Sequence, residues 1–236
     1  MSHHFVDLNN VKFKYPDGRQ AVNGITARIT HGEAVGIVGT NGAGKSTLLS
    51  LIVGILLPSE GEISIGETPV TKKTLSHIRE RVGLLFQNAD DQLFMNTVYD
   101  DVAFGPRNYQ LDEKAVEERV KRALEAVGAW HLKDRAPYKL SGGEKRAAAI
   151  AALLAMEPDI LLMDEPTAAL DPRARRRLIN LLKTFSHTKV IATHDLDMVL
   201  DVCERTIIIN NGKIVADGPS FKILSDEELL DRKSVV

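Results

Sequence analysis

The stretch GTNGAGKST, residues 39–47, decides how the rest of the chain is interpreted. It has the spacing G-x-x-x-x-G-K-[ST], it follows AVGIVG, which predicts a strand, and it opens the helix predicted from KSTLLSLIVG. Gly39, Gly42 and Gly44 let the backbone curl so that successive N–H groups point at phosphate oxygens, and the helix N-terminus adds positive partial charge. The alternative is a glycine-rich turn that only closes a strand–helix unit. The full motif in this context favours a phosphate-binding loop.

The side chains of this loop fit a nucleoside triphosphate. Lys45 is predicted to bridge the β- and γ-phosphates of ATP, and the Ser46 hydroxyl is predicted to ligate Mg²⁺. ATP and Mg²⁺ are therefore the expected cofactors. The nucleotide-binding residues predicted from the loop are Gly39, Thr40, Asn41, Gly42, Ala43, Gly44, Lys45, Ser46 and Thr47.

Two adjacent carboxylates follow a second apolar strand. DILLMDEP, residues 159–166, places Asp164 and Glu165 at the carboxyl end of that strand, where open α/β sheets bind their ligands. Asp164 is predicted to hold Mg²⁺ through water, and Glu165 to polarise the attacking water. In the alternative, the two acids only cap the helix predicted from Pro172. The phosphate-binding loop in the same chain disfavours that alternative.

Composition limits the remaining possibilities. The chain has 236 residues, 44% of them hydrophobic, and a net charge of −2, so it can bury a large core and lacks the basic footprint of a dedicated nucleic-acid binder. A single cysteine, Cys203, fits a reducing compartment. The N-terminus MSHHFVDLNN lacks the layout of a secretory signal, and the longest apolar run, residues 147–156, is about half of the ~20 residues that span a bilayer. Any membrane function is therefore expected to depend on partner proteins.

The order of predicted elements indicates the fold class. Residues 5–37 contain short alternating runs that predict β-structure, and strands alternate with helices again after residue 158. Between them, DEKAVEERVKRALEAVG predicts a helix with Asp112 as N-cap and Gly128 as its end. We expect a P-loop NTPase core of RecA-like α/β type, with an N-terminal antiparallel β-subdomain and a helical subdomain inserted at about residues 88–156. The whole chain, residues 1–236, is expected to form one domain with a short tail at about 219–236.

A second anion-binding helix terminus is predicted from LSGGE, residues 140–144. Ser141 opens a long alanine-rich helix, and Gly142 and Gly143 expose its first N–H groups. Since one ATP already has its loop, another subunit's ATP is the simplest ligand, which predicts a two-fold dimer. The alternative is an ordinary capping box, with Ser141 as N-cap and Glu144 at the third helical position.

With these motifs the chain resembles the nucleotide-binding subunit of ATP-binding-cassette transporters along nearly its full length. The resemblance implies that Tyr15 stacks on adenine, although alone it would be taken for a strand-end aromatic. It implies that Gln87 contacts Mg²⁺ and the attacking water, and that His194 contacts the γ-phosphate. Asp171 in AALD would cross the dimer interface, with Ser141, Gly142, Gly143 and Glu144 contacting the partner subunit's ATP. Thr40 departs from the proline common in the family, but this position supplies backbone only.

The segment FQNADDQLF, residues 86–94, then becomes a docking surface for a membrane subunit. Its mixed acidic and apolar composition suits a short helix that carries apolar and basic groups. The expected docking residues are Asp90, Asp91, Gln92, Leu93 and Phe94. The sequence FQNADDQLF…TVYDDVAFGP resembles that of the ATPases of energy-coupling-factor importers. The short C-terminal tail resembles the tails of the cobalt/nickel branch of these ATPases.

The resemblance implies an ATPase at the cytoplasmic side of the membrane. Its implied partners are a sister copy or sister ATPase, an integral membrane coupling subunit and a substrate-binding membrane subunit, without nucleic acid. One alternative is a soluble ATPase that assists iron–sulfur cluster assembly. The other, a nucleic-acid maintenance or translation ATPase, lacks its expected coiled-coil insertion, tandem cassette and basic surface. The remaining histidines, His131 among them, and the run RARRR, residues 173–177, are interpreted as surface, although arginines near Asp171 could reach a partner subunit.

Overall fold

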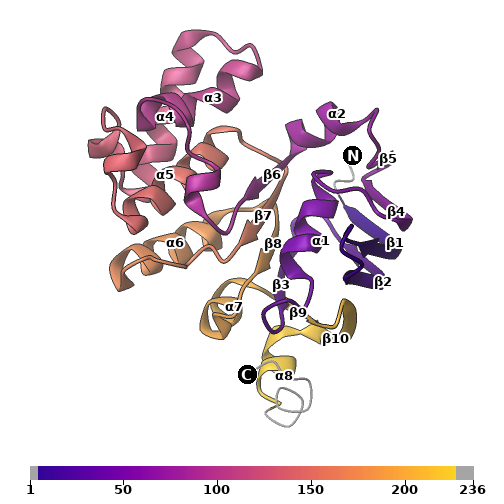
Figure 1. The fold of residues 1–236 in the computed structure, drawn as a ribbon. Helices are drawn as coiled ribbons and strands as arrows, with labels where there is room; N and C mark the ends of the chain where they lie inside the picture. Colours follow the sequence, from indigo (N-terminus) through magenta and orange to yellow (C-terminus); the bar gives the residue numbers. More distant parts are fainter. Residues whose placement is uncertain (1–4, 227–236) are drawn as a thin grey trace. The chain divides into compact units, whose positions relative to one another are not determined.

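The computed structural model describes residues 5–226, which form two sheets and two groups of helices (Figure 1). The first sheet has four strands in the order β2-β1-β4-β5, and its neighbouring strands are antiparallel. Val6 lies opposite Ile29 on one side and Ile65 on the other, and all three side chains are buried. The four strands are β1 (Val6–Lys14), β2 (Gln20–Ile29), β4 (Glu60–Ile65) and β5 (Thr68–Pro69).

The second sheet has six strands in the order β10-β9-β3-β8-β7-β6. Strand β3 is parallel to β8 and β9, β7 is parallel to β8, and β10 is antiparallel to β9. Every residue of β3, β7 and β8 is buried, and most residues of these strands are apolar, as expected for parallel strands covered on both faces. The strands are β3 (Ala34–Val38), β6 (Val82–Leu85), β7 (Ile160–Asp164), β8 (Thr188–Ala192), β9 (Arg205–Asn210) and β10 (Lys213–Pro219).

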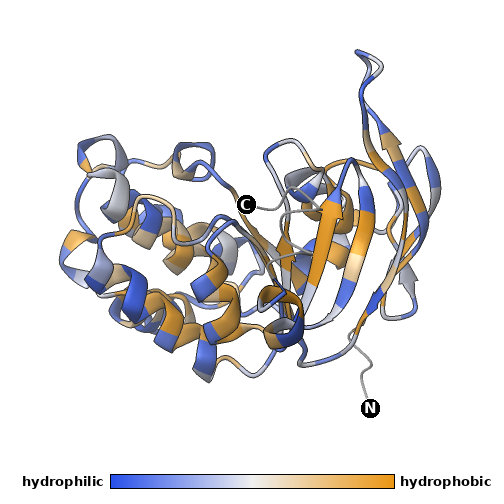
Figure 2. Cartoon of the chain, turned by 90° about the horizontal axis from the view of Figure 1, so that it is seen from below, coloured by the Kyte–Doolittle hydropathy of each residue, from blue (hydrophilic) through white to orange (hydrophobic). Residues whose placement is uncertain are grey.

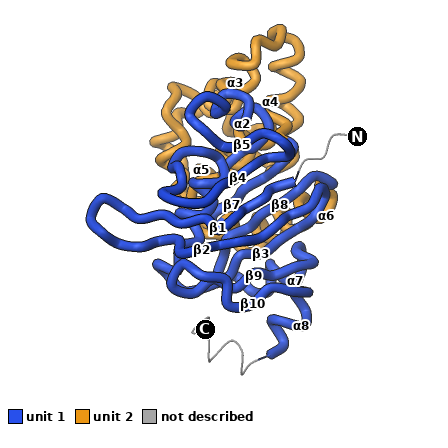
Figure 3. The backbone as a smooth tube through the Cα atoms, turned by 90° about the vertical axis from the view of Figure 1, so that its right-hand side faces the viewer, with its two compact units in different colours: residues 1–84, 159–165, 186–236 blue, residues 85–158, 166–185 orange. Residues whose placement is uncertain are grey.

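The chain divides into two compact units (Figure 3). The first, residues 1–84, 159–165 and 186–236, contains both sheets apart from the end of β6. Its core joins residues of both sheets with the apolar side of α1. The helices of this unit are α1 (Lys45–Ile52), α2 (Leu75–Arg81), α7 (Leu196–Val202) and α8 (Ser220–Leu224). We call it the P-loop unit.

The second unit, residues 85–158 and 166–185, is helical, and we call it the helical unit. Its helices carry apolar and polar residues side by side, as the hydropathy colouring in Figure 2 shows. In α4 the buried residues Val116, Val120 and Leu124 recur at helical spacing, as amphipathic packing requires. The long helices are α3 (Val98–Asn108), α4 (Glu113–Val127), α5 (Gly142–Ala155) and α6 (Pro172–Thr184); short 3₁₀ turns are η1 (Ala89–Asp91), η2 (Trp130–Leu132) and η3 (Pro137–Lys139).

The predicted fold class is confirmed, and several boundaries agree in detail. Helix α4 begins after Asp112, whose side chain accepts the Ala115 N–H, and ends at Gly128 with a φ of 74°. The helical unit is broader than the expected insertion at 88–156, because it also contains residues 166–185. Of the expected tail, residues 227–236 lie outside the described part of the chain. Within residues 5–226, none of the helices combines the length and apolar character that a bilayer crossing requires.

Candidate active site

The loop of residues 39–44 connects β3 to α1 and depends on two glycines. A Cβ atom on Gly39 would lie 2.1 Å from the Ile209 carbonyl oxygen, and one on Gly44 would lie 2.3 Å from that of Ala21. Gly44 also has a φ of 109° and, as N-cap of α1, it offers no side-chain acceptor to the first N–H groups of the helix. The helix terminus therefore remains available to an anion. Of the predicted residues, Thr40, Asn41, Gly42 and Ser46 are exposed, whereas Gly39, Ala43, Gly44, Lys45 and Thr47 are buried.

Lys45 folds back over this loop. Its Nζ atom donates to the carbonyl oxygens of Gly39, at 2.6 Å, and Thr40, at 3.1 Å, and the residue is only 7% exposed. Burial lowers the pKa of Lys45, while the charges of Glu165 and Asp164 act in the opposite direction. An ammonium group is thus held at the loop, with two carboxylates within electrostatic reach.

Glu165 and His194, both predicted to be catalytic, are in direct contact. The His194 Nδ1 atom lies 2.9 Å from Glu165 Oε1, and the buried Thr193 hydroxyl donates to Oε2 at 2.9 Å. The Glu165 N–H donates to the Ala192 carbonyl at 2.8 Å, which fixes its backbone to the end of β8. Thr193 was not recognised in the sequence, because a threonine at a strand end gives no pattern of its own. The carboxylate is held on both oxygens at the edge of the sheet.

The oxygen groups near the loop fit a magnesium ion bound together with nucleotide phosphates. Asp164 is 6% exposed at the end of β7, and Ser46 lies in the first turn of α1. No group of three or more histidine, cysteine, aspartate or glutamate side chains that could hold a metal occurs among residues 5–226. Mg²⁺ usually binds one or two carboxylates plus substrate phosphates and does not need such a group.

Tyr15 lies beside the phosphate-binding helix. Its hydroxyl is 3.0 Å from the Thr47 hydroxyl, and the Arg19 guanidinium lies 4.8 Å from its ring centroid. The Phe13 and Tyr15 rings pack edge-to-face, with their centroids 4.9 Å apart. Arg19 was not predicted as a site residue from the sequence, because PDGR is typical only of a turn. The aromatic predicted for adenine is therefore held beside Thr47, with a cation over its ring.

The predicted Ser141 site belongs to the helical unit, and its capping box is formed. The Ser141 N–H donates to Glu144 Oε2 at 2.8 Å, and the Glu144 N–H donates to Ser141 Oγ at 3.3 Å. The hydrogen bonds with Ser141 lower the pKa of Glu144 most, and the nearby Arg135 and His131 side chains lower it further. Capping and anion binding do not compete here, because the box uses the Ser141 and Glu144 amides and leaves those of Gly142 and Gly143.

A cavity of about 340 Å³ surrounds this helix terminus within the helical unit. Ser141, Gly143, Glu144 and Asp171 all line it, so the structure brings together residues predicted to contact a partner subunit's ATP. The Asp171 carboxylate accepts the N–H groups of Arg173 and Ala174 and caps α6. The basic residues that line the same cavity, which the sequence did not assign to this site, are His131, Arg173 and Arg177.

The predicted docking segment, residues 86–94, is corrected at Leu93, which is only 8% exposed because its side chain packs into the unit. Gln92 is half-buried, and its amide donates to the Ala149 carbonyl at 2.9 Å. Asp91 is exposed, and Asp90 pairs with Lys145 at 2.6 Å. Phe94 is 64% exposed and packs edge-to-face on Phe104, which is 40% exposed, with ring centroids 5.0 Å apart. The exposed apolar surface is thus the pair Phe94–Phe104, of which Phe104 was missed. Gln87, the second residue of this segment, is exposed.

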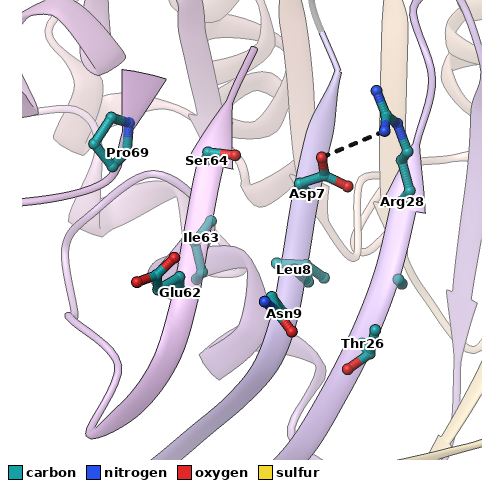
Figure 4. A pocket seen from close by; sticks show the side chains of 10 residues that line it. Asp7, Leu8, Asn9, Thr26, Arg28, Glu62, Ile63, Ser64 and Pro69 are labelled. Carbon is teal, nitrogen blue, oxygen red and sulfur yellow. Dashed lines mark ion pairs between the residues drawn. The ribbon is translucent and has the colours of Figure 1, made fainter. Parts of the chain in front are cut away.

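Another cavity, of about 430 Å³, lies on the four-stranded sheet of the P-loop unit. Figure 4 shows that its polar side chains come from neighbouring strands, with Asp7 paired to Arg28 at 3.7 Å. None of the predicted site residues lines it. It therefore does not compete with the loop of residues 39–47 as the candidate active site.

Residues 22–168, more than half of the chain, match the protein family described as ABC transporter. The chain belongs to this ABC transporter family. A putative ABC transporter ATP-binding protein of Geobacter sulfurreducens is 56% identical over 98% of this chain and 92% of its own length. EcfA of Methanothermobacter thermautotrophicus, an energy-coupling factor transporter ATP-binding protein, is 45% identical over 98% of this chain and 76% of its own length.

Solved ABC structures agree with this assignment. The structure of cbiO1 from Clostridium perfringens, part of the ABC transporter complex cbiONQ, has a TM-score of 0.83 at 38% identity, over 98% of this chain and 94% of that chain. A dimeric ATP-binding cassette in a post-hydrolysis state, bound to ADP and phosphate, has a TM-score of 0.85 at 29% identity, over 91% of this chain and 98% of that chain. This ABC protein is therefore the ATPase subunit of a transporter, and it hydrolyses ATP with Mg²⁺.

Proposed function

We propose that this ABC ATPase drives the import of a trace nutrient, with cobalt or nickel ions as cargo, through separate membrane subunits. The names of two similar proteins support an energy-coupling-factor transporter: EcfA at 45% identity and cbiO1 of a cbiONQ complex at 38% identity. The observation that carries the transport part is the exposed pair Phe94–Phe104, since an apolar patch of this kind marks a binding surface. Cargo selection is assigned to a substrate-binding membrane subunit.

The residues of the P-loop unit would bind and cleave ATP. Lys45 and the amides of residues 39–47 hold the phosphates, Tyr15 contacts adenine, and Ser46 and Asp164 hold Mg²⁺. Gln87, which belongs to the helical unit, is proposed as a further Mg²⁺ ligand. When bound, Mg²⁺ neutralises charge on the β- and γ-phosphates. Glu165 orients the attacking water and accepts its proton, and His194 contacts the γ-phosphate. The 2.9 Å contact between His194 Nδ1 and Glu165 Oε1 supports this shared role.

The helical unit would complete the site of a second copy or of a sister ATPase. Ser141, Gly142, Gly143 and Glu144 contact the partner's ATP, and Asp171 lies at the interface. The cavity of about 340 Å³ supports this, because arginines and a helix N-terminus surround it, a combination that attracts phosphate. Closure of the dimer on two ATP molecules precedes hydrolysis in both sites.

Asp90, Asp91 and Phe94, with Phe104, form the proposed docking surface for the membrane coupling subunit. An aromatic pair beside two carboxylates suits a helix with apolar and basic side chains. The ATPase would then sit peripherally on the cytoplasmic side of the membrane. In this assembly, closure and release of the ATPase dimer move the membrane subunit.

A pull-down of Glu165→Gln from the native cells in MgATP tests this function, because the variant is expected to remain in the ATP-bound state. Mass spectrometry of the eluate should identify two integral membrane proteins, which Lys45→Ala recovers more weakly. Cells lacking the recovered substrate-binding protein should lose uptake of cobalt or nickel ions. An eluate with only soluble partners would overturn the proposed importer function and favour an assembly factor. Unchanged uptake of both metals would overturn cobalt or nickel as the proposed cargo.

A further inference from the structure

Arg146 is among the largest fully buried side chains of the protein, at 2% exposure. It lies in the second turn of α5, five residues after Ser141. Its Nη1 atom donates to the carbonyl oxygens of Phe86 and of Gln87, the latter at 3.1 Å, and its Nε atom donates to that of Pro166 at 3.2 Å. The same guanidinium therefore contacts the turn that carries Gln87 and the residue that directly follows Glu165.

The guanidinium fixes these three carbonyl groups relative to α5. Its donors form a rigid planar fork, so the acceptors must lie at set positions in one plane. A buried cation also requires that its donors stay occupied, which makes separation of these segments costly. A lysine could supply the charge but only at one point.

Two further contacts join α5 to the docking segment. The Gln92 amide donates to the Ala149 carbonyl at 2.9 Å, and its oxygen accepts the Phe86 N–H at 3.4 Å. Lys145 pairs with Asp90 at 2.6 Å, but the Asp90 side chain is 63% exposed, so this ion pair is weak. Arg146 is the buried contact of the three, and it dominates the connection.

We propose that Arg146 is a positioning residue that makes the docking segment and α5 move as one body. A membrane subunit that displaces residues 88–94 would then displace Ser141 and Gly143, which lie at the beginning of the same helix. The proposal rests on the proposed function, in which Ser141 contacts the partner subunit's ATP. Its consequence is that docking on one subunit controls hydrolysis in the ATP site of the other.

The first test separates ATP binding from turnover in Arg146→Met and Arg146→Lys. Affinity for a fluorescent ATP analogue should stay unchanged, because the phosphate-binding loop lies in the P-loop unit. The kcat should fall on the order of 10²-fold in Arg146→Met, the loss expected from a ~1 Å misplacement, and less in Arg146→Lys. Arg122→Met, which removes a surface guanidinium from α4, serves as the matched control and should keep its kcat. Unchanged kcat in both Arg146 variants would overturn the proposal, and so would an equal loss of affinity and kcat in folded Arg146→Lys.

The second test mixes Arg146→Met with Lys45→Ala. The mixed dimer has one site with an intact phosphate-binding loop from one copy and an intact α5 from the other, so ATPase activity should recover above that of either variant alone. Dimer formation by Glu165→Gln in MgATP is measured separately by sedimentation. If dimers form but activity does not recover, Arg146 acts only on its own subunit's site and the proposal is overturned. If no dimers form, the proposed two-fold arrangement itself is wrong.

Discussion

The charged groups at the centre of the P-loop unit's site and the groups of the helical unit that are proposed to meet partners are held in opposite ways. In the first, Lys45, Asp164 and Glu165 are each 7% exposed or less and are held by contacts within the unit. In the second, Ser141, Asp171 and Phe94 are exposed. A buried constellation is assembled before any ligand arrives, whereas exposed caps and aromatics need a partner to complete them. This contrast fits the proposed function, in which one unit performs the chemistry and the other receives contacts from other chains.

The largest effect should come from the carboxylate of the P-loop unit. Glu165→Gln is expected to bind ATP but to turn over at least ~10²-fold more slowly, because it loses a positioned acid–base group. Phosphate release and nucleotide affinity, measured on the same preparation, separate the two effects. Glu67→Gln in the same unit provides the control, and a Glu165→Gln enzyme of normal kcat would remove the catalytic assignment.

Loss of the loop cation should act on binding. Lys45→Ala is expected to weaken ATP binding roughly 10- to 100-fold, the range for a hydrogen bond to a charged group. The measurement is calorimetric titration with MgATP, with the exposed Lys213→Ala as control. An ATP affinity equal to that of the control would show that the buried ammonium contributes nothing to phosphate binding. It would then contradict the contrast between the two units.

Ser141→Ala should affect turnover without affecting the nucleotide affinity of the isolated subunit. Loss of a neutral hydroxyl donor to a phosphate is expected to lower kcat about 10-fold. The same substitution removes an N-cap, which costs ~1 kcal/mol of stability. Glu144→Ala breaks the same capping box from its other side, so thermal melting of both variants shows how much of the kcat loss is only unfolding. Equal losses of affinity and kcat in Ser141→Ala would place this residue in its own subunit's site.

Much of the P-loop unit could be predicted because its signals are local. Gly44 and Lys45 occur within one short motif, and Asp164 and Glu165 end a strand that is apolar throughout. The two ends of α4 in the helical unit could also be predicted, since Asp112 and Gly128 cap this helix directly. Such features depend on neighbours in sequence, which pattern and propensity describe well.

The unpredicted features depend on contacts between distant segments. Helix α3 was not predicted individually, and its Asp101 is buried and accepts the N–H groups of Phe94 and Met95 at 2.9 and 3.0 Å. Burial raises the pKa of Asp101, and these two hydrogen bonds act against that rise. An aspartate that orients a loop preceding its own helix looks like a surface acid in the sequence. The same applies to Arg146, which a helical pattern alone would place in solvent.

The exposed aromatic of the helical unit should affect partner binding. Phe94→Ala is expected to reduce recovery of membrane subunits about 3- to 10-fold, because it removes apolar contact and an aromatic pair of ~0.5–1.5 kcal/mol. Phe104→Ala should act in the same direction. Phe221 in the P-loop unit is 78% exposed, so Phe221→Ala is a matched control. Equal recovery for all three variants would mean that the docking surface lies elsewhere.

The smallest effect concerns the thiol of Cys203, which reports on the P-loop unit alone. The residue is 5% exposed, and burial raises its pKa from 9.0 to about 12. The reactive thiolate is therefore roughly 10³-fold scarcer at neutral pH than for an ordinary cysteine, and alkylation of the native protein should be slow. The sign follows from burial, which disfavours the charged form of the thiol, so labelling should accelerate on raising the pH or on unfolding.

Cys203 is the single cysteine of the chain, so all labelling reports on this one thiol. Ser141→Ala and Phe94→Ala change the helical unit and should leave the labelling rate of Cys203 unchanged at neutral pH. Faster labelling in either variant, beyond the increase that its loss of global stability in thermal melting accounts for, would show that a change in the helical unit loosens the P-loop unit, and the separation of roles between the two units would then fail.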